Sequence, residues 1–194
     1  MTLGPGAEPL RSPPAAPTHG DVGAAAALLF GAAVAVTLGA YGRLHGPTGI
    51  AVSVAGFSSP QTVKVWLATG AMFLAVIQLV SASAMYGKLP GARAPEWTGT
   101  AHRWSGRIAF LLSVPVAVHC LYALGLQTYD LRVTVHSLLG CLFYGAFSAK
   151  MLLLTRSGLA GWVLPLAGGV TFTAFMGLWL ASSVWFFTTT GVTF

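Results

Sequence analysis

The stretch FLLSVPVAVHCLYAL, residues 110–124, decides the fold class of this chain. It carries no charged residue, yet it places His119 well inside an apolar run. A second apolar run begins at Leu131 and carries His136 at a similar distance from the turn between the two runs. Because a polar side chain in hydrocarbon costs free energy unless it has a partner, an intramembrane histidine indicates a functional site.

Composition places the whole chain among integral membrane proteins. Of the 194 residues, 55% are hydrophobic and only 7% are charged, and the mean hydropathy is +0.75. These values exclude an ordinary soluble domain and a disordered chain alike. A helix needs about 20 apolar residues to cross roughly 30 Å of hydrocarbon. The sequence therefore predicts an all-α, polytopic bundle of five transmembrane helices over residues 22–41, 62–86, 104–124, 131–154 and 162–187.

The first residues and the basic side chains predict the orientation of the bundle. Residues 1–20 are rich in proline and lack the basic start and apolar core of a signal peptide, so we expect a flexible cytoplasmic tail. The tail, the second loop and the fourth loop hold Arg11, Lys88, Arg93, Arg103, Arg107, Lys150 and Arg156, whereas the other side holds Arg43, Lys64 and Arg132. Because basic residues favour the inner side, we expect the N-terminus in the cytoplasm and the C-terminus outside. The two intramembrane histidines then lie in the outer leaflet.

Other sequence features exclude several classes of function. The net charge of +6 does not indicate a nucleic-acid partner, because the basic residues are spread over helix ends and form no compact patch. No acidic residue lies inside a predicted span, which argues against proton-coupled transport. There is no Walker loop, zinc motif or nucleophile–base set. Cys120 and Cys141 lie inside predicted helices, where we expect small buried thiols; a disulfide or metal pair is the alternative.

The two intramembrane histidines are predicted to share one ligand. Gly125 suits the left-handed position after a helix, and Asp130 suits an N-cap, so the third helix should end near Leu124 and the fourth should begin near Leu131. Each histidine then lies about 7 to 8 Å below the outer helix ends. Two imidazoles at one depth indicate the axial ligands of a b-type haem.

One face of the fourth helix supports this hypothesis. Residues at helical spacing share that face: Arg132, His136, Gly140, Phe143 and Phe147. Gly140 would let a flat ring approach the backbone, and Arg132 would pair with a propionate. The alternative is that Gly140 and Gly145 serve helix packing, with the phenylalanines in the core or facing lipid.

Two more residues predict local features of the helices. Pro115 lies four residues before His119 and predicts a kink just below it, although membrane helices also tolerate proline without a functional consequence. Gln78 lies midway along the second span, where we expect an interhelical hydrogen bond.

His102 is predicted in the first turn of the third helix, with Thr100 as its N-cap. It precedes His119 by 17 residues, which leaves the two about 100° apart around the helix, so they do not share a site. His102 is a candidate ligand of a second haem, with Met85 or Met151 as its partner. The alternatives are contact with a lipid, quinone or propionate head group, or simple interfacial solvation.

The remaining histidines lie outside the predicted spans. His45 is in the outer loop and is the main alternative candidate for an axial haem ligand. A histidine in such a position is more often a loop residue without a role in binding. His19 lies in the predicted tail, and we expect no role for it.

Several motifs resemble an actinobacterial family of uncharacterised membrane proteins. They are MYGKLP (85–90), HRWSGR (102–107), HCLY (119–122), HSLLGC (136–141) and YGAFSAK (144–150), and the likeness covers residues 41–187. More distantly, a His-Arg-x-x-Gly-Arg start to a helix that carries another histidine is similar to di-haem transmembrane cytochromes b and ferric-reductase-like domains. That resemblance implies electron transfer through b haem held by histidines of different helices. Those cytochromes use four intramembrane histidines, whereas this chain has two, so we expect a single outer-leaflet haem.

Three hypotheses follow. The first is a five-helix protein of the bacterial plasma membrane in which His119 and His136 hold one haem b and electrons pass to a quinone or a redox partner protein. The second is a non-catalytic membrane subunit or assembly factor whose histidines make interhelical hydrogen bonds. The third is a copper or other metal handler that uses His, Cys and Met side chains.

Overall fold

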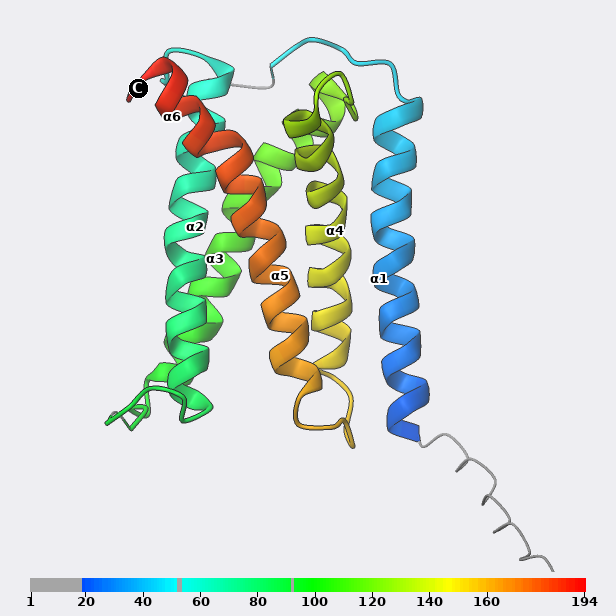
Figure 1. Ribbon diagram of the computed structural model, residues 1–194, viewed down its shortest axis with the longest axis vertical. Helices are drawn as coiled ribbons and strands as arrows, with labels where there is room; N and C mark the ends of the chain where they lie inside the picture. The colour runs from blue at the N-terminus through cyan, green and yellow to red at the C-terminus, as the bar shows by residue number, and fades with distance from the viewer. Residues whose placement is uncertain (1–18, 52–53, 92) are drawn as a thin grey trace, which may run out of the picture.

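The computed structural model describes residues 19–51, 54–91 and 93–194. Five long helices in this part of the chain confirm the predicted all-α bundle (Figure 1). They are α1 (His19–Leu44), α2 (Pro60–Met85), α3 (Thr98–His119), α4 (Leu131–Leu153) and α5 (Val163–Trp179). The predicted tail falls outside the described residues apart from its last two positions, which begin α1.

Two of the five helices are extended by π-helical turns. The turn η1 (Cys120–Leu124) continues α3, and the turn η2 (Leu180–Val184) joins α5 to a short last helix, α6 (Trp185–Thr190). With these extensions, each of the five segments is long and apolar enough to cross a membrane. The chain is therefore a multi-pass membrane protein by length and composition of its helices.

Local chemistry explains most of the helix boundaries. Asp130 caps α4 as predicted, because its carboxylate accepts a hydrogen bond from the Val133 backbone N–H at 2.7 Å. Gly125 follows the third segment with φ +70°, as predicted for a glycine past a helix end. The predicted start of the third helix is wrong. The helix begins at Thr98, after a turn in which the Pro95 carbonyl accepts from the Thr98 N–H at 3.0 Å, so Thr100 is not its cap.

The helices pack in an order that differs from their order in the chain. α1 lies against α4, α4 against α5, α5 against α2, and α2 against α3 (Figure 1). α3 and α4 are joined by the short connection 125–130, yet α3 makes its main contacts with α2, and α4 with α1 and α5. We call the end of the bundle that carries this connection the upper end, and the opposite end the lower end, as drawn in Figure 1.

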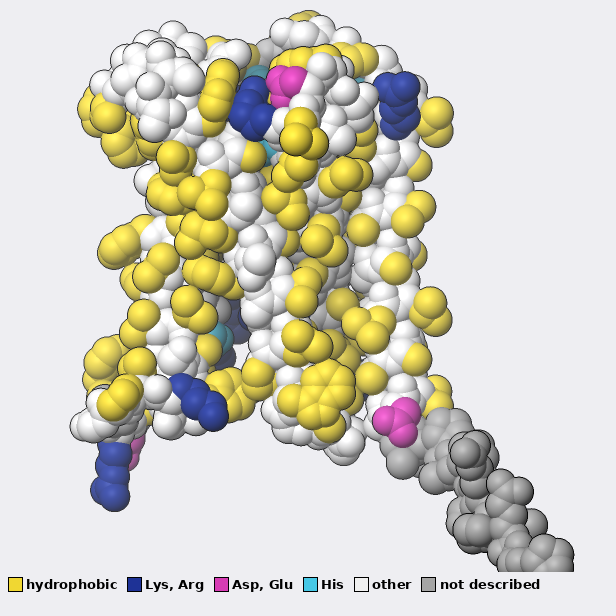
Figure 2. Space-filling view, in the orientation of Figure 1, with side chains coloured by type: hydrophobic (Ala, Val, Ile, Leu, Met, Phe, Trp, Pro, Cys, Tyr) yellow, Lys and Arg dark blue, Asp and Glu magenta, His cyan; other side chains and the backbone are white. Residues whose placement is uncertain are grey.

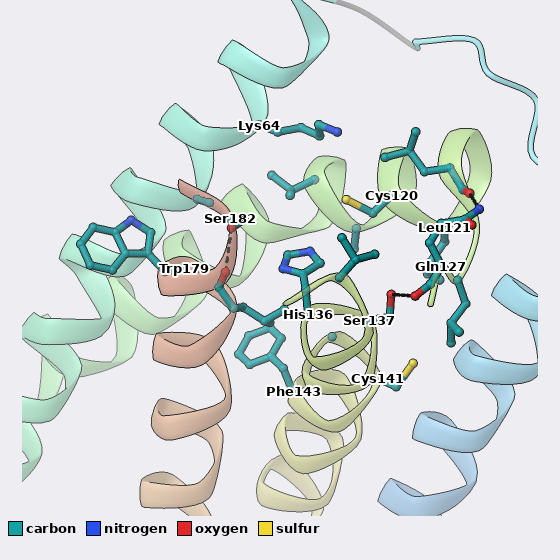
Figure 3. Close-up of a pocket in the computed structure, with 18 of the residues that line it drawn as sticks. Lys64, Cys120, Leu121, Gln127, His136, Ser137, Cys141, Phe143, Trp179 and Ser182 are labelled. Carbon is teal, nitrogen blue, oxygen red and sulfur yellow. Dashed lines mark hydrogen bonds between the residues drawn. The ribbon is translucent and has the colours of Figure 1, made fainter. Parts of the chain in front are cut away.

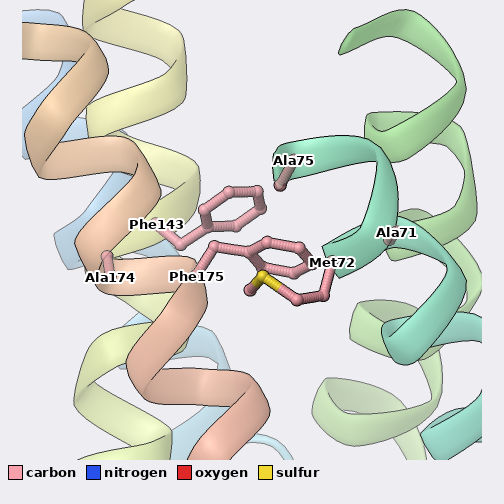
Figure 4. Close-up of a cluster of buried hydrophobic side chains, with 6 residues drawn as sticks. All are labelled: Ala71, Met72, Ala75, Phe143, Ala174 and Phe175. Atoms are coloured by element: carbon pink, nitrogen blue, oxygen red, sulfur yellow. The ribbon is translucent and has the colours of Figure 1, made fainter. Parts of the chain in front are cut away.

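A small core joins α2 to α4 and α5. The rings of Phe143 and Phe175 stack with centroids 4.9 Å apart, and Ala71, Met72 and Ala75 of α2 face them (Figure 4). Lipid is as apolar as these side chains, so close packing and interhelical hydrogen bonds, rather than exclusion of water, hold such helices together. The small alanines let the two rings fill the space between the helices.

The surface of the bundle matches a membrane environment. Hydrophobic side chains cover its middle, whereas charged side chains gather toward its two ends (Figure 2). Large side chains such as Leu29, Phe73 and Leu138 are more than half exposed in the isolated chain. A soluble protein rarely exposes so continuous an apolar surface, and contact with membrane lipid accounts for it.

α1 and α4 approach each other most closely at a pair of glycines. A Cβ atom built on Gly145 would lie 2.5 Å from the Gly31 carbonyl oxygen, and one built on Gly31 would lie 2.5 Å from the Gly145 carbonyl oxygen. Small residues at a crossing let two membrane helices pack backbone to backbone. Gly145 therefore serves helix packing, which was the alternative considered for it.

We predict that Gly145→Ala lowers the stability of the bundle. The added methyl group forces the two backbones apart, and overpacking of this kind costs about 1–3 kcal/mol. The measurement is the midpoint of thermal unfolding in detergent, with Gly168→Ala as the control, since nothing lies within 4 Å of a Cβ atom at Gly168. Equal midpoints for the two variants would contradict the packing described here.

Candidate functional site

A cavity of about 560 Å³ opens between α3 and α4 in the upper half of the bundle. α2 and the segment from α5 to α6 complete its walls. Most of its lining is apolar. The polar, charged and thiol side chains in the lining include Lys64, Cys120, Arg132, His136, Ser137, Cys141 and Ser182. The cavity lies between α3 and α4 because α3 packs against α2, whereas α4 packs against α1 and α5.

The cavity is closed below by contacts between α3 and α4. The Tyr144 hydroxyl donates to the Ser113 carbonyl oxygen at 3.0 Å and lies 3.0 Å from the Ser113 hydroxyl. Further down, the rings of Phe110 and Phe147 stack with centroids 4.3 Å apart. These contacts separate the cavity from the lower half of the bundle.

Both π-helical turns contribute to the wall of the cavity. η1 provides Cys120, Leu121 and Leu124, and η2 provides Ser182. π-helical turns are rare, and they occur frequently at functional sites because they re-aim side chains within a helix. α3 remains an α-helix through Pro115 as far as His119, so its departure from α geometry lies above the position where the proline predicted a kink.

His136 is the imidazole of this cavity. Its ring points from α4 into the cavity, toward Lys64 and Cys120 on the opposite wall (Figure 3). The Leu178 carbonyl lies beside the ring, but the buried Nδ1 atom makes no hydrogen bond with any residue that the structure describes. Because Nδ1 is closed off, a ligand in the cavity would meet the ring at its other nitrogen, Nε2.

Two cationic side chains line the cavity near this imidazole. Lys64 extends its amino group toward the cavity (Figure 3), and within the described part of the chain it makes no ion pair or hydrogen bond. Arg132 is already held, because it donates to the Ala181 carbonyl oxygen at 2.9 Å and lies 3.8 Å from the ring centroid of Trp185. Asp130 lies 4.0 Å from the same guanidinium group.

Gly140 lines the cavity one turn below His136. A Cβ atom built there would meet only the Leu178 side chain, at 3.9 Å, so Gly140 has room that Gly145 lacks. The structure thus gives the two glycines of α4 different surroundings. Cys120 and Cys141 both line the cavity as free thiols, so the alternative of a disulfide between them is wrong.

His119 does not share this cavity with His136. The residues of α3 that line it include Ser113, Val116 and Ala117, and helical geometry places His119 about 60° to 160° around the helix from them. Its side chain is buried, with 8% of its surface exposed. Lys64 lies within electrostatic range of both imidazoles, but the two do not converge on one space.

His45 is packed between two tyrosines at the upper end. Its ring stacks on Tyr41 at 4.9 Å and on Tyr122 at 5.3 Å, and its Nε2 atom lies 3.2 Å from the Tyr122 carbonyl oxygen. These contacts tie the end of α1 to η1. They also occupy both faces of the ring and its Nε2 atom.

His102 lies at the contact of α2 and α3, in the lower half of the bundle. Its Nδ1 atom is 2.8 Å from the Ser81 hydroxyl. Gln78 donates from Nε2 to the His102 carbonyl oxygen and, at 2.7 Å, to the Ser105 hydroxyl. These bonds confirm the interhelical role predicted for Gln78.

Sequence reasoning missed Lys64 as a residue of the site. The sequence-based prediction includes Lys64 only among the basic residues of the outer side, although a lysine four residues inside a helix that begins at Pro60 itself indicates a candidate site. For the third hypothesis, the described residues include no group of three or more His, Cys, Asp or Glu side chains that could hold a metal ion.

Comparisons with known proteins complete this description. No curated protein matches the chain, and no solved structure matches it. A family described as "Family of unknown function (DUF6529)" matches residues 24–194, which cover most of the first membrane-spanning segment and all of the other four. The chain therefore belongs to the DUF6529 family.

Proposed function

We propose that this protein is an integral membrane b-type haem protein that takes part in electron transfer, with one haem in the upper cavity. The observation that carries the proposal is the imidazole of His136, whose ring points from α4 into an apolar cavity and faces the cations that line it. The resemblance of the segment HRWSGR (102–107) to cytochromes b also supports it.

The residues of the cavity fit an amphiphilic ring with acidic groups. A volume of about 560 Å³ lies within the range of about 300–1,000 Å³ found for small-molecule sites. Apolar walls suit a macrocycle, and the room above Gly140 suits the approach of a flat group to α4. Lys64 and Arg132 would neutralise carboxylates at the cavity, so that both charges are paired in a region of low dielectric.

Each residue then has a distinct role. His136 would hold the iron through an imidazole nitrogen, and Lys64 and Arg132 would hold the propionates. Phe143 and Tyr144 form the lower wall of the cavity and exclude water from below. When bound, haem supplies one-electron redox chemistry, and the protein sets its potential through ligation, burial and nearby charge.

The geometry favours one protein imidazole rather than two. The hypothesis from the sequence uses both His119 and His136, but His119 lies on a different face of α3 from the residues that line the cavity. His136 would then be the histidine of the cavity that holds the haem. We therefore keep His136 as the ligand and make the role of His119 an outcome of the experiment.

The proposal extends to partners and location. Electrons would pass to or from a quinone or a redox partner protein, since the described residues form only a membrane bundle with short connections. The excess of basic residues at the lower end favours that end as cytoplasmic, in the plasma membrane of a bacterium of the actinobacterial type.

A second candidate function is a non-catalytic membrane subunit whose histidines are structural. Two specific observations favour it: His45 is enclosed by Tyr41 and Tyr122, and His102 is bonded to Ser81. The unpartnered atom of His136 is what this alternative leaves without an explanation.

We predict Soret and α bands in the reduced-minus-oxidised absorbance of the detergent-purified protein, expressed with haem supplied. His136→Ala should lower the haem content about tenfold or more, since loss of an axial ligand exceeds about 1.4 kcal/mol of binding free energy. His45→Ala is the matched control and should keep the bands, because its ring already has protein partners.

The same spectra separate the alternatives. Absence of both bands in the wild-type protein would remove the haem proposal and favour the non-catalytic subunit. Loss of the bands in His119→Ala together with His136→Ala would restore the two-histidine site. Loss in His119→Ala alone would move the site to another face of α3.

We also predict that Gly140→Leu blocks the cavity without unfolding the protein. The Cβ atom of the leucine would meet only the Leu178 side chain, and the rest of the side chain would extend from the lining into the cavity, so the helix contacts of α4 are retained. Haem content should fall several-fold while the thermal unfolding midpoint of the apoprotein stays close to that of the wild type. The control is Gly168→Leu, and equal haem contents in the two variants would show that the cavity is not the binding site.

A further inference from the structure

A polar cluster lies between α2 and α3 in the lower half of the bundle, apart from the upper cavity. Gln78 and Ser81 contribute from α2, and Thr98, His102 and Ser105 contribute from α3. The upper cavity is lined by other residues of these helices, and the contacts of Tyr144 and Phe147 with α3 lie between the two regions. The cluster therefore needs an explanation of its own.

Hydrogen bonding in this cluster selects one tautomer of His102. The Ser81 hydroxyl has a single proton, and it donates to the Ile77 carbonyl oxygen at 2.6 Å, with the Gln78 carbonyl oxygen at 3.1 Å. When that proton lies on the Ile77 carbonyl, which is the shortest contact, the Ser81 oxygen accepts from the His102 Nδ1 atom, 2.8 Å away. This arrangement places the proton of the neutral ring on Nδ1 and leaves a lone pair on Nε2, whereas donation from Ser81 to Nδ1 would give the opposite tautomer.

Gln78 holds the same ring in place through the backbone. Its amide donates to the His102 carbonyl oxygen and to the Ser105 hydroxyl, and a Cβ atom on Gly106 would lie 2.9 Å from its Oε1 atom. A histidine that ligates a group through one nitrogen almost always donates from the other nitrogen to an orienting partner. Here the orienting partner is Ser81, and the available nitrogen is Nε2.

Two further groups in the lower half of the bundle can donate hydrogen bonds. The ammonium group of Lys150 from α4 lies within electrostatic range of the His102 ring. The Thr98 hydroxyl, one turn before His102 on α3, belongs to a side chain that is only 5% exposed, and it has no partner among the described residues. A histidine and basic side chains are visible together in a hollow of the lower half (Figure 2).

We propose that His102 binds the hydroxyl group of a lipid-soluble hydroquinone that enters from the lower leaflet. The hydroquinone O–H donates to Nε2, and Lys150 or Thr98 donates to a ring oxygen. The oxidised quinone has no hydroxyl proton to give to Nε2, so the site selects the reduced ring over the oxidised one. This inference rests on the proposed function in electron transfer, for which it names the membrane-soluble partner.

The test compares the two redox forms of one ligand. We use 2,3-dimethyl-1,4-naphthoquinone and its hydroquinone under anaerobic conditions, with equilibrium dialysis against the full chain in detergent. The chain carries His136→Ala, so that a haem in the upper cavity cannot oxidise the probe. The hydroquinone should bind about tenfold or more tightly than the quinone, which corresponds to about 1.4 kcal/mol for the bond to Nε2.

Variants of the cluster connect this preference to the tautomer. His102→Ala and Ser81→Ala should each reduce the preference at least several-fold, the second because the ring is then free to place its proton on Nε2. Ser83→Ala is the matched control, since the Ser83 hydroxyl donates to the Leu79 carbonyl oxygen, at 2.8 Å, and is exposed. Equal binding of the two redox forms by the parent chain, or an unchanged preference in His102→Ala, would overturn the proposal.

A spectroscopic measurement of the His102 tautomer in the wild-type chain tests the proposal even if the variants do not fold. In the wild-type chain labelled with ¹⁵N-histidine, the signals that disappear in His102→Gln should belong to a protonated Nδ1 and an unprotonated Nε2. The opposite assignment would overturn the proposal. Hydroquinone selectivity without haem bands would remove only the proposed function, whereas haem bands without selectivity would remove only the site at His102.

Discussion

The close approach of α1 and α4 is the contact on which the upper cavity depends. Gly31 and Gly145 let these two backbones touch, and any side chain at either position would clash with the opposite carbonyl group. α4 is thereby held between α1 and α5, while α3 is held on α2 by the bonds of Gln78. The connection 125–130 joins α3 to α4, but the two helices belong to different pairs, and a space remains between them at the upper end.

The described histidines show how surroundings separate residues of the same type. His45 has aromatic rings on both faces and a carbonyl oxygen at one nitrogen, so its capacity for contact is used within the fold. His102 is bonded at one nitrogen only, and His136 has a buried nitrogen without a bond. In a membrane, where water is scarce, these differences matter more than they would at a soluble surface.

The two polar regions of the bundle suit different ligands. The upper cavity combines one imidazole with the cations of Lys64 and Arg132, so it favours a ring that carries acidic groups. The lower cluster presents a lone pair on His102 beside donors, so it favours a ligand with its own hydroxyl proton. The core around Phe143 and the bond from Tyr144 to Ser113 lie between them and keep the regions distinct.

The amino-acid sequence by itself determined the fold class, the five spans and several local features. Span length follows from the thickness of the bilayer and the cap at Asp130 from local hydrogen bonding, and neither requires knowledge of distant residues. The same holds for Gln78, because an amide in hydrocarbon must find a partner on a neighbouring helix. The start of α3 was misplaced, since the turn at Pro95 begins the helix without a side-chain cap.

Only the tertiary structure decided which side chains meet. Depth along a helix can be counted from its ends, and it placed His119 and His136 at one level. The direction of each side chain depends on the rotation of its helix, which packing against other helices sets, and that rotation separates His119 from the cavity. The π-helical turns and the neighbour of each glycine likewise depend on contacts between segments far apart in the chain. For this reason the sequence alone could not assign Lys64 to the site: its place in the cavity wall depends on the packing of α2 against α5 and η2.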